Sequence, residues 1–320
     1  MRNTTTRPTR SFEYRLMAPL APSAMPREAL TPTFDAHVHV WQRRWQNFIV
    51  GTGRAGRFDQ RDLMLGLMDR HGVRRACLIA ANDELNPDNN EFVASICRKN
   101  PDRFVMLAEI PLCSSKREHL LDMTLGVWPA SGFRYMAGPG EGPRDWMAPE
   151  GDSFWERANA ESLLVALNLS SAQAALLEPL IERYSNVRWL LDHMARPRFD
   201  MSAGEYRGVL GLARYPNVFV KVSGFYAFTA RSSEYPYLDL TRFIKSLRDA
   251  FGSEQLLWGS DAPPVLDFSS YEQSFACLLR EEMGLSDDDL AWVFGRTAEN
   301  LFVAPPPNRV AAPPRSLSHE

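Results

Sequence analysis

Residues 33–40 read TFDAHVHV, and this stretch decides how the rest of the chain is interpreted. It is rich in β-branched and aromatic residues, and it places His37 and His39 two positions apart, which is the repeat of a β-strand. A doubly wound open sheet would usually carry a glycine-rich turn after its first strand. Here the strand runs into Trp41 without a glycine, which favours a closed barrel over the open sheet.

Short β-rich runs recur along the chain, and helical patterns separate them. The eight runs are Thr33–Val40, Arg75–Ala81, Phe104–Ile110, Gly132–Met136, Leu163–Leu169, Val187–Leu191, Val218–Val222 and Gln255–Gly259. Between them, Gln173–Tyr184 predicts an amphipathic helix with Leu176, Leu177, Leu180 and Ile181 on one stripe. Eight strands that alternate with helices predict an α/β fold, a (β/α)8 TIM barrel forming a single domain.

Composition excludes several classes of protein. The 320 residues carry 36 Lys and Arg against 39 Asp and Glu, a net charge of -3, so the chain lacks the basic footprint of a nucleic-acid-binding protein. No apolar run approaches the roughly 20 residues that span a bilayer. The four cysteines are widely spaced without a C-x-x-C pair, which argues against a zinc ribbon and favours a reducing, cytoplasmic location.

The two ends of the chain differ from its middle. Residues 1–30 are rich in Arg, Thr, Pro and Ala and predict a disordered arm, with a transit peptide as the alternative. Residues 304–320 predict a proline-rich disordered tail. The barrel is therefore expected over residues 31–303.

Two histidines share one face of the first predicted strand. Because side chains two apart point the same way, His37 and His39 both face inward if Val38 and Val40 pack outward. Two imidazoles on one face are half of a divalent metal site, which a carboxylate can complete. The alternative is a pair of hydrogen-bonded histidines in a polar core.

Two other predicted strands end in titratable groups, and functional groups of such barrels lie at the carboxyl ends of the strands. Asp192 and His193 follow the sixth strand, where alternation would place only one of them inside. We expect His193 to be that residue and to act as an acid, base or carbonyl-polarising group, while Asp192 caps the next segment. Asp261 follows the eighth strand and is predicted to bind a metal or to take a proton from water.

Substrate-binding candidates surround these groups. The planar fork of Arg134, on the fourth predicted strand, can hold a carboxylate, although a structural salt bridge is the alternative. Trp41 and Tyr226 are the other expected substrate-binding residues, and the alternative for both Phe225 and Tyr226 is that they simply pack instead of walling the pocket. The loop over residues 42–60 carries Arg43, Arg44, Arg54 and Arg57 with Trp45. Together these residues predict a small anionic substrate, and the alternative for each loop arginine is a solvated surface charge.

Several motifs resemble those of the amidohydrolase superfamily, most closely its branch of lactonases and decarboxylases. They are FDAHVHVW over 34–41, LDHMARP over 191–197 and WGSDAP over 258–263, with VKVSG over 220–224 and FGRTAENLF over 294–302. The resemblance covers nearly all of residues 33–302. It implies a (β/α)8 barrel that hydrolyses small molecules by activating water.

This chain differs from many members of that family at two positions, and the differences reduce the number of metal ions expected in the site. Many members complete a metal centre with a lysine on the fourth strand and a histidine on the fifth, where this chain has Arg134 and ends the strand in Asn168. The resemblance therefore implies at most one divalent ion, zinc first, on His37, His39 and Asp261. A metal-free site is the alternative, because the lactonase branch includes metal-independent members.

These observations lead to three hypotheses. The first is a lactonase in which Asp261 deprotonates water, His193 with His37 and His39 or their metal polarises the carbonyl, and Arg134 anchors a substrate carboxylate. The second is a metal-dependent nonoxidative decarboxylase of an aromatic or unsaturated acid. The third is a catalytically idle barrel that binds a metabolite or a protein. The sequence does not indicate the oligomeric state, although large barrels often pair as homodimers.

Overall fold

The sheet of this computed structural model has eight strands that are adjacent in chain order. The structure describes residues 30–43, 59–147 and 152–303, so most of the predicted arm and all of the predicted tail lie outside the described residues. All seven neighbouring pairs are parallel. The strands are β1 (Phe34–Val38), β2 (Arg75–Ile79), β3 (Phe104–Glu109), β4 (Ala130–Met136), β5 (Leu164–Asn168), β6 (Arg188–Leu191), β7 (Val218–Val222) and β8 (Leu256–Trp258).

The sheet closes on itself where the first strand meets the segment after the last. Val38 forms a parallel bridge with Ala262. The backbone N–H of His39 donates to the Ala262 carbonyl at 2.7 Å, and that of Asp261 donates to the His37 carbonyl at 2.9 Å. The predicted (β/α)8 barrel is thereby confirmed, and the closing seam runs directly through the predicted site residues.

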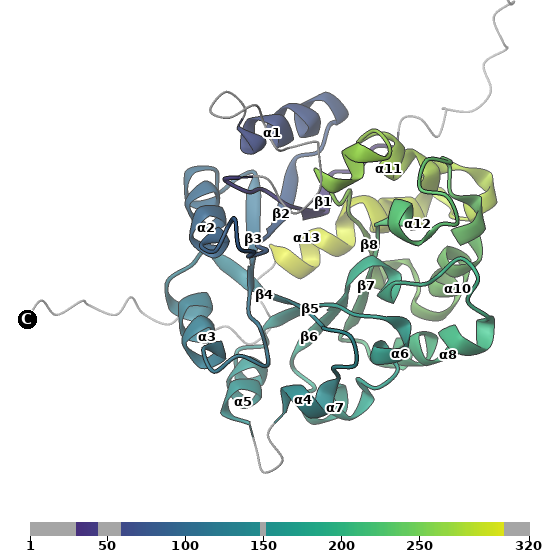
Figure 1. Cartoon of the computed structure of the whole chain (residues 1–320). Coiled ribbons are helices and arrows are strands. Elements are labelled where there is room, and N and C mark those ends of the chain that lie inside the picture. Colours follow the sequence, from purple (N-terminus) through teal and green to yellow (C-terminus); the bar gives the residue numbers. More distant parts are fainter. Residues whose placement is uncertain (1–29, 44–58, 148–151, 304–320) are drawn as a thin grey trace, which may run out of the picture.

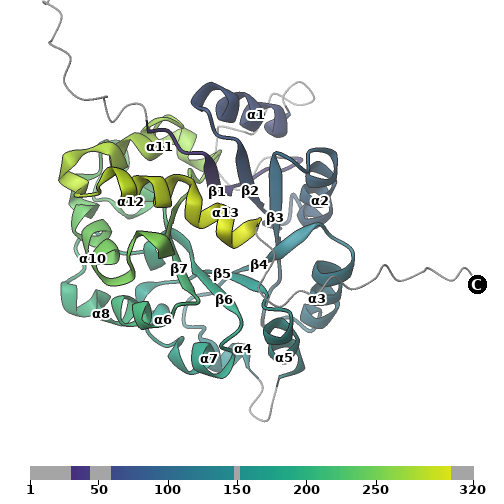
Figure 2. The same cartoon turned by 180° about the vertical axis from the view of Figure 1, so that it is seen from behind.

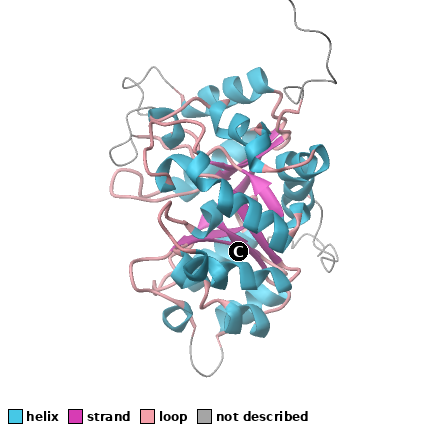
Figure 3. Cartoon of the chain, turned by 90° about the vertical axis from the view of Figure 1, so that its right-hand side faces the viewer, coloured by secondary structure: helices cyan, strands magenta, loops and turns pink. Residues whose placement is uncertain are grey.

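Helices surround the strands on the outside of the barrel (Figures 1 and 3). The α-helices of the described residues are α1 (Gln60–His71), α2 (Asn89–Lys99), α3 (Arg117–Gly126), α4 (Pro143–Trp146), α5 (Ser153–Ala160), α6 (Ser171–Ala174), α7 (Glu178–Arg183), α8 (Ala203–Gly211), α9 (Phe225–Phe228), α10 (Thr241–Phe251), α11 (Gln273–Ala276), α12 (Asp287–Ala291) and α13 (Thr297–Phe302), of which α13 lies across one end of the barrel. Within the described residues, none of these helices is long and apolar enough to span a membrane.

The single helix predicted over Gln173–Tyr184 is wrong, because the chain forms α6 and α7 with a turn between them. Pro179 lies in the first turn of α7, where its missing N–H costs nothing, but it could not continue a helix that arrives from α6. The turn moves Leu176 off the predicted stripe, and its side chain is 58% exposed. Leu180 and Ile181 are buried as expected.

Helix α13 closes one end of the barrel. Its Phe302 ring stacks on Phe34, at the start of β1, with centroids 5.5 Å apart. The carbonyl of Leu301 accepts from Arg188, at the start of β6, and Glu299 pairs with Arg75, at the start of β2. These contacts place α13 across the amino-terminal ends of the strands, near the middle of the molecule in Figure 2. The opposite end is left for the groups that follow the strands.

Candidate active site

Strand β1 contains a register shift that sets the direction of His37. Its pairing with β2 is irregular between Asp35 and Val38, so an extra residue interrupts the alternation. The Asp35 carboxylate accepts the backbone N–H of His37 at 3.1 Å and that of Ser260 at 2.8 Å. Asp35 is fully buried, and burial raises its pKa to about 6. This aspartate therefore holds the seam between β1 and the β8 end instead of lining the cavity.

Close contact at that seam depends on a glycine. A Cβ built on Gly259 would lie 2.6 Å from the Cβ of His37 and 2.9 Å from its backbone nitrogen. No larger residue fits there without moving β1 or β8. The sequence Gly259–Ser260–Asp261 thus brings the two ends of the barrel together beside His37.

Three potential ligand atoms converge at the seam. The Nε2 atoms of His37 and His39 lie 3.0 Å apart, and Oδ1 of Asp261 lies 3.6 Å from the first and 3.7 Å from the second. All three side chains are nearly or fully buried. Burial lowers the pKa of His37 well below its usual value and that of His39 to about 3, whereas it raises the pKa of Asp261. Both imidazoles are therefore neutral at pH 7.

The outer nitrogens of the two imidazoles have different partners. Nδ1 of His39 lies 2.9 Å from the Ile79 carbonyl, which can only accept, so this nitrogen carries the proton and Nε2 keeps its lone pair. Nδ1 of His37 lies 3.2 Å from the Lys221 ammonium and 3.7 Å from Oδ1 of Asp192. The His37 ring therefore has a donor and an acceptor behind it, and either tautomer has a partner.

A buried ion-pair network lies behind His37. Asp192 is fully buried, 2.9 Å from the Lys221 ammonium and 3.2 Å from Nε of Arg134. Burial by itself would raise the pKa of Asp192, but Lys221, His37 and Arg134 hold it well below its usual value. The carboxylate thus compensates two buried cations, and it acts as neither a cap nor a wall of the cavity.

A left-handed turn follows β6. His193, Met194, Ala195 and Arg196 all have φ between 51° and 57°, although none is glycine, and each such residue costs roughly 1–2 kcal/mol. The Tyr206 hydroxyl donates to the Met194 carbonyl at 2.7 Å, and the Ser171 hydroxyl donates to that of Ala195 at 2.7 Å. Helices α8 and α6 therefore hold a strained backbone in place from behind.

The turn places His193 and not Asp192 in the cavity wall, as expected, although strand alternation is not the reason. Strand β6 ends at Leu191, so the two residues no longer alternate across a sheet, and both approach His37. The ring centroids of His193 and His37 are 4.5 Å apart. Nδ1 of His193 lies 2.8 Å from the Ser223 hydroxyl, and Nε2 lies 4.0 Å from Oδ2 of Asp261. Burial lowers the pKa of His193.

Asp261 is held in one orientation. Its φ is 59°, a left-handed conformation that aims the side chain at the histidines. The Tyr226 hydroxyl donates to Oδ2 at 2.8 Å, so Oδ1 is left to face His37 and His39. The Tyr226 ring stacks on Phe268 with centroids 4.7 Å apart. One carboxylate oxygen is thus fixed and the other is available for chemistry.

The groups surround a cavity of about 300 Å³ at the carboxyl ends of the strands. It brings together most of the site residues predicted from sequence, and His37 lies behind His39. Its lining residues are His39, Trp41, Ala81, Arg134, Met136, Asn168, His193, Arg196, Tyr226, Ala227, Phe228, Asp261 and Pro264. Trp41 stacks on His39 with centroids 4.9 Å apart.

Other predicted residues lie elsewhere. Phe225 stacks on Tyr237 and does not line the cavity. Arg43 is exposed. The remaining loop residues of the prediction, Arg44, Trp45, Arg54 and Arg57, lie outside the described residues.

Sequence reasoning missed two basic residues. Lys221 lies in the middle of the apolar strand Val218–Val222, and a strand of a parallel barrel is covered on both faces. A lysine there must be buried and paired, so the signal was present. Arg196 offered no such signal, because its place in the cavity wall depends on the left-handed turn.

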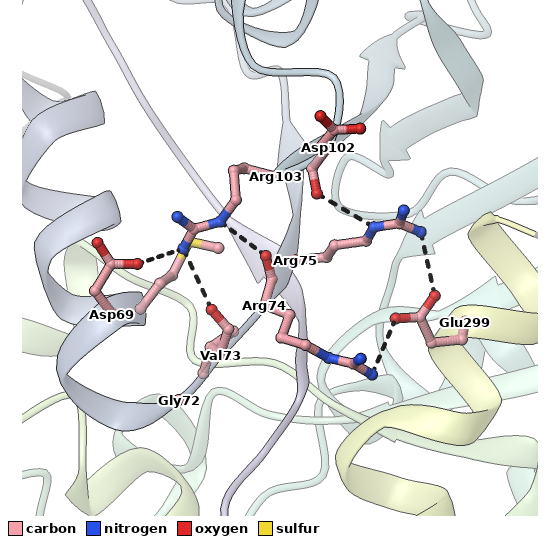
Figure 4. A pocket seen from close by; sticks show the side chains of 9 residues that line it. Asp69, Gly72, Val73, Arg74, Arg75, Asp102, Arg103 and Glu299 are labelled. Carbon is pink, nitrogen blue, oxygen red and sulfur yellow. Dashed lines mark hydrogen bonds and ion pairs between the residues drawn. The ribbon is translucent and has the colours of Figure 1, made fainter.

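A larger hollow of about 640 Å³ lies at the other end of the barrel (Figure 4). Arg103 reaches Asp69 at 2.7 Å, and Arg75 reaches Glu299 at 3.3 Å and the Asp102 carbonyl at 3.3 Å. The guanidinium groups of Arg75 and Arg103 are thus occupied by carboxylates and carbonyls. Despite its size, this hollow fits a structural role.

The donor set of the cavity fits one divalent ion. His37, His39 and Asp261 form one group whose ligand atoms lie close enough to share an ion. Their separations of 3.0–3.7 Å suit ligands bound at about 2.0–2.2 Å. Asp192 behind His37 supplies the carboxylate partner that metal-bound histidines commonly have. At the ends of β4 and β5, Arg134 and Asn168 add no imidazole, thiolate or carboxylate to this group. A second possible group among the described residues, His37, Asp192 and His193, shares His37 with the first.

Known proteins share this architecture. The amidohydrolase family model matches residues 34–303. An L-fucono-1,5-lactonase of Burkholderia ambifaria is 34% identical over 86 residues, a stretch that spans 25% of this chain and only 28% of that relative. An amidohydrolase structure from Burkholderia multivorans with bound zinc has 20% identity and a TM-score of 0.69, covering 86% of this chain and 100% of that one. A probable 2-pyrone-4,6-dicarboxylic acid hydrolase from Acinetobacter baumannii, with citric acid bound, has 19% identity and a TM-score of 0.65, covering 85% and 99%.

Proposed function

Because the chain belongs to the amidohydrolase family, we propose that it is a hydrolase that opens a small carboxylated lactone. The observation that carries this proposal is the convergence of His37, His39, His193 and Asp261 on one cavity at the carboxyl ends of the strands. Lactone names among the relatives support the substrate class. The reaction needs a base for water and donors for the oxygen that gains charge.

Asp261 is the proposed general base. Its Oδ1 takes a proton from water while the water oxygen attacks the lactone carbonyl carbon. A raised pKa makes this carboxylate a stronger base than an exposed aspartate. The Tyr226 hydroxyl on Oδ2 fixes the plane of the carboxylate, so the accepting oxygen is already oriented when water arrives.

His193 is the proposed donor to the oxyanion. In the tautomer in which Nδ1 accepts the Ser223 hydroxyl, the neutral ring carries its proton on Nε2, which lies 4.0 Å from Oδ2 of Asp261. This N–H stabilises the negative oxygen of the tetrahedral intermediate. The ring C–O bond then breaks, the electron pair goes to the ring oxygen, and that oxygen takes the proton from Asp261. The base is thereby restored, and the product is a hydroxy acid.

One divalent ion, zinc, would be held by Nε2 of His37, Nε2 of His39 and Oδ1 of Asp261. Because a carboxylate oxygen has two lone pairs, Oδ1 would bind the ion with one and still accept a water proton with the other. When bound there, it would supply Lewis-acid polarisation of the carbonyl and a lower pKa for a coordinated water. His39 has the required tautomer already, because the Ile79 carbonyl holds the proton on Nδ1. For His37, Asp192 would accept the Nδ1 proton.

Arg134 and Trp41 are the proposed substrate-positioning groups. Nε of Arg134 is engaged by Asp192, and its side chain also lines the cavity, so the outer nitrogens are left for a substrate oxygen. Trp41 is held by a hydrogen bond from its indole N–H to the Ala81 carbonyl and presents a flat apolar wall beside His39. A small planar or puckered ring fits between such a wall and the polar groups.

The test combines metal analysis with activity. Freshly purified protein is assayed by elemental analysis and against 2-pyrone-4,6-dicarboxylate and L-fucono-1,5-lactone, with and without a chelator. Acid release from a lactone supports the proposal, and its loss on chelation, restored by zinc, supports the metal assignment. Failure to open either lactone, together with release of carbon dioxide from aromatic acids, would replace it by the decarboxylase hypothesis.

A further inference from the structure

Among the described residues, Lys221 is the only fully buried lysine, and it lies directly behind His37. Its Nζ is 3.2 Å from Nδ1 of His37 and 2.9 Å from Oδ1 of Asp192. An ammonium group has three donors and no acceptor, so a hydrogen bond between the two nitrogens requires a lone pair on Nδ1 of His37. A neutral imidazole carries one proton. Lys221 therefore favours the tautomer of His37 that has its proton on the other nitrogen, Nε2.

The contact on the other side of the His37 ring leads to the same tautomer. Nε2 of His39 keeps its lone pair, because the Ile79 carbonyl accepts from Nδ1 of that ring at 2.9 Å. Nε2 of His37 lies 3.0 Å from this nitrogen. Two lone pairs at that distance would repel, whereas a proton on Nε2 of His37 makes the contact a hydrogen bond. Without an ion, the donors thus form one directed chain from Lys221 through His37 and His39 to Ile79.

Binding of a divalent ion requires the opposite tautomer of His37. The ion needs the Nε2 lone pairs of both His37 and His39, so the His37 proton must then lie on Nδ1. There it meets the Lys221 ammonium, which is another donor, at 3.2 Å, and the carboxylate oxygen of Asp192 that could accept it is 3.7 Å away. The hydrogen bond from Lys221 to His37 is therefore lost when the ion binds, and this loss weakens the binding.

We propose that Lys221 is a positioning residue that holds the His37 proton on Nε2, so that the two histidines are ordered without a metal and zinc binds only with loss of this hydrogen bond. The inference rests on the metal site of the proposed function and names a residue that sets its zinc affinity. It does not depend on the lactone substrate. Lys221 can be removed without leaving a buried charge alone, because Asp192 still pairs with Arg134 at 3.2 Å.

The first test determines the tautomer of His37 in the metal-stripped wild-type chain. Long-range proton–nitrogen correlation spectra of protein with labelled histidines distinguish a protonated ring nitrogen from one that has a lone pair. The spectrum of H37N identifies the signals of His37 among those of the six histidines. The proton is expected on Nε2 of His37 and on Nδ1 of His39. Addition of zinc should move the His37 proton to Nδ1 and leave that of His39 in place.

The second test measures the affinity for zinc by competition with a chromophoric chelator. K221M removes the donor behind His37 and keeps an unbranched side chain of similar length. Its Kd for zinc should be about tenfold or more lower than that of the wild type, the effect of one charge-assisted hydrogen bond. K245M removes the same charge from an exposed position on α10 and should bind zinc as the wild type does. Adding H39Q to K221M should abolish the gain, which would locate the zinc at this site.

Three results would each overturn the proposal. They are a His37 proton on Nδ1 in the metal-free wild type, a K221M chain that binds zinc no more tightly than the wild type, and an equal gain in K245M. The wild-type spectrum decides the first of these even if K221M does not fold. Because both tests are made without substrate, lactone assays on the same proteins report separately on the proposed function.

Discussion

The polar side chains at the two ends of the barrel differ in whether they have partners within the protein. At the amino-terminal end, Arg75 and Arg103 reach carboxylates and carbonyls, and α13 covers the strands. At the carboxyl end, Arg196 and the Asn168 amide have no side-chain partners among the described residues, and the backbone of five non-glycine positions, 193–196 and 261, is left-handed. Of the two hollows described above, the larger lies at the amino-terminal end, where the polar groups have partners. Unsatisfied groups and strained backbone thus indicate the site better than volume does.

The largest loss of activity is expected from a substitution at the carboxyl end, the removal of the proposed general base Asp261. Replacing Asp261 by Asn keeps the shape and the Tyr226 contact but leaves no group to accept a proton from water. We expect kcat for lactone hydrolysis to fall by about 10³-fold, with the free energy of unfolding changing little. Steady-state kinetics and a denaturant titration check both values. Turnover within threefold of the wild type would remove Asp261 from the mechanism.

The same residue should set the pH dependence. Asp261 accepts a proton only when it is ionised, and burial raises its pKa, so kcat/KM should rise with pH through a limb with a midpoint above the usual value of 3.8. D261N should lose this limb. A wild-type profile that is flat down to pH 4 would contradict the assignment.

Two glycine-to-alanine substitutions compare the β1–β8 seam with the end of the barrel that α13 covers. Gly259→Ala would place a Cβ 2.6 Å from His37 Cβ, and Gly295→Ala would place one against Thr33 Oγ1 at the start of the barrel. Both should lower the free energy of unfolding by about 1–3 kcal/mol through overpacking. Only Gly259→Ala should also lower kcat, because it moves His37. Equal kcat losses in the two folded variants would mean that the seam has no special role.

The left-handed turn can be weakened without touching the cavity. Tyr206→Phe removes the hydroxyl that donates to the Met194 carbonyl and leaves a buried carbonyl without its partner, so stability should fall by about 1–2 kcal/mol. Since the turn positions His193, kcat should fall several-fold while the Kd for an unreactive ligand that contacts only the seam stays constant. Tyr271→Phe, which removes a hydroxyl from Asp35 at 2.8 Å, is the matched control for losing a buried tyrosine hydroxyl.

Sequence patterns were enough for the strands and for part of the site. His37 lies beside His39 as predicted, although the regular alternation behind that prediction is interrupted in β1. His193 lies near Asp261 because closure of a barrel brings all carboxyl ends together. Two backbone features could not be predicted from the sequence, the register shift in β1 and the four left-handed residues after β6. In the second, none of Asp192–Arg196 is glycine, so no residue indicates a left-handed backbone. Such backbone is imposed by distant contacts, here from Ser171 and Tyr206. The wrong expectation that Asp192 caps the next segment, and the failure to place Arg196 in the cavity wall, both follow from that one turn.

The smallest effect on stability and activity is expected at the amino-terminal end of the barrel, where the charged side chains already have partners. Glu299 lies 3.3 Å from Arg75 and 4.0 Å from Arg74, and its side chain is 30% exposed. Glu299→Gln removes an ion pair that water and salt already screen, so the free energy of unfolding should fall by less than about 1 kcal/mol and kcat/KM should not change. Because Arg75 keeps the Asp102 carbonyl as a partner, no buried charge is left alone. Denaturant titrations at low and high salt should show the difference shrinking as salt rises. A loss of activity in this variant would mean that the two ends of the barrel are coupled through α13, and the contrast between a structural and a functional end would then fail.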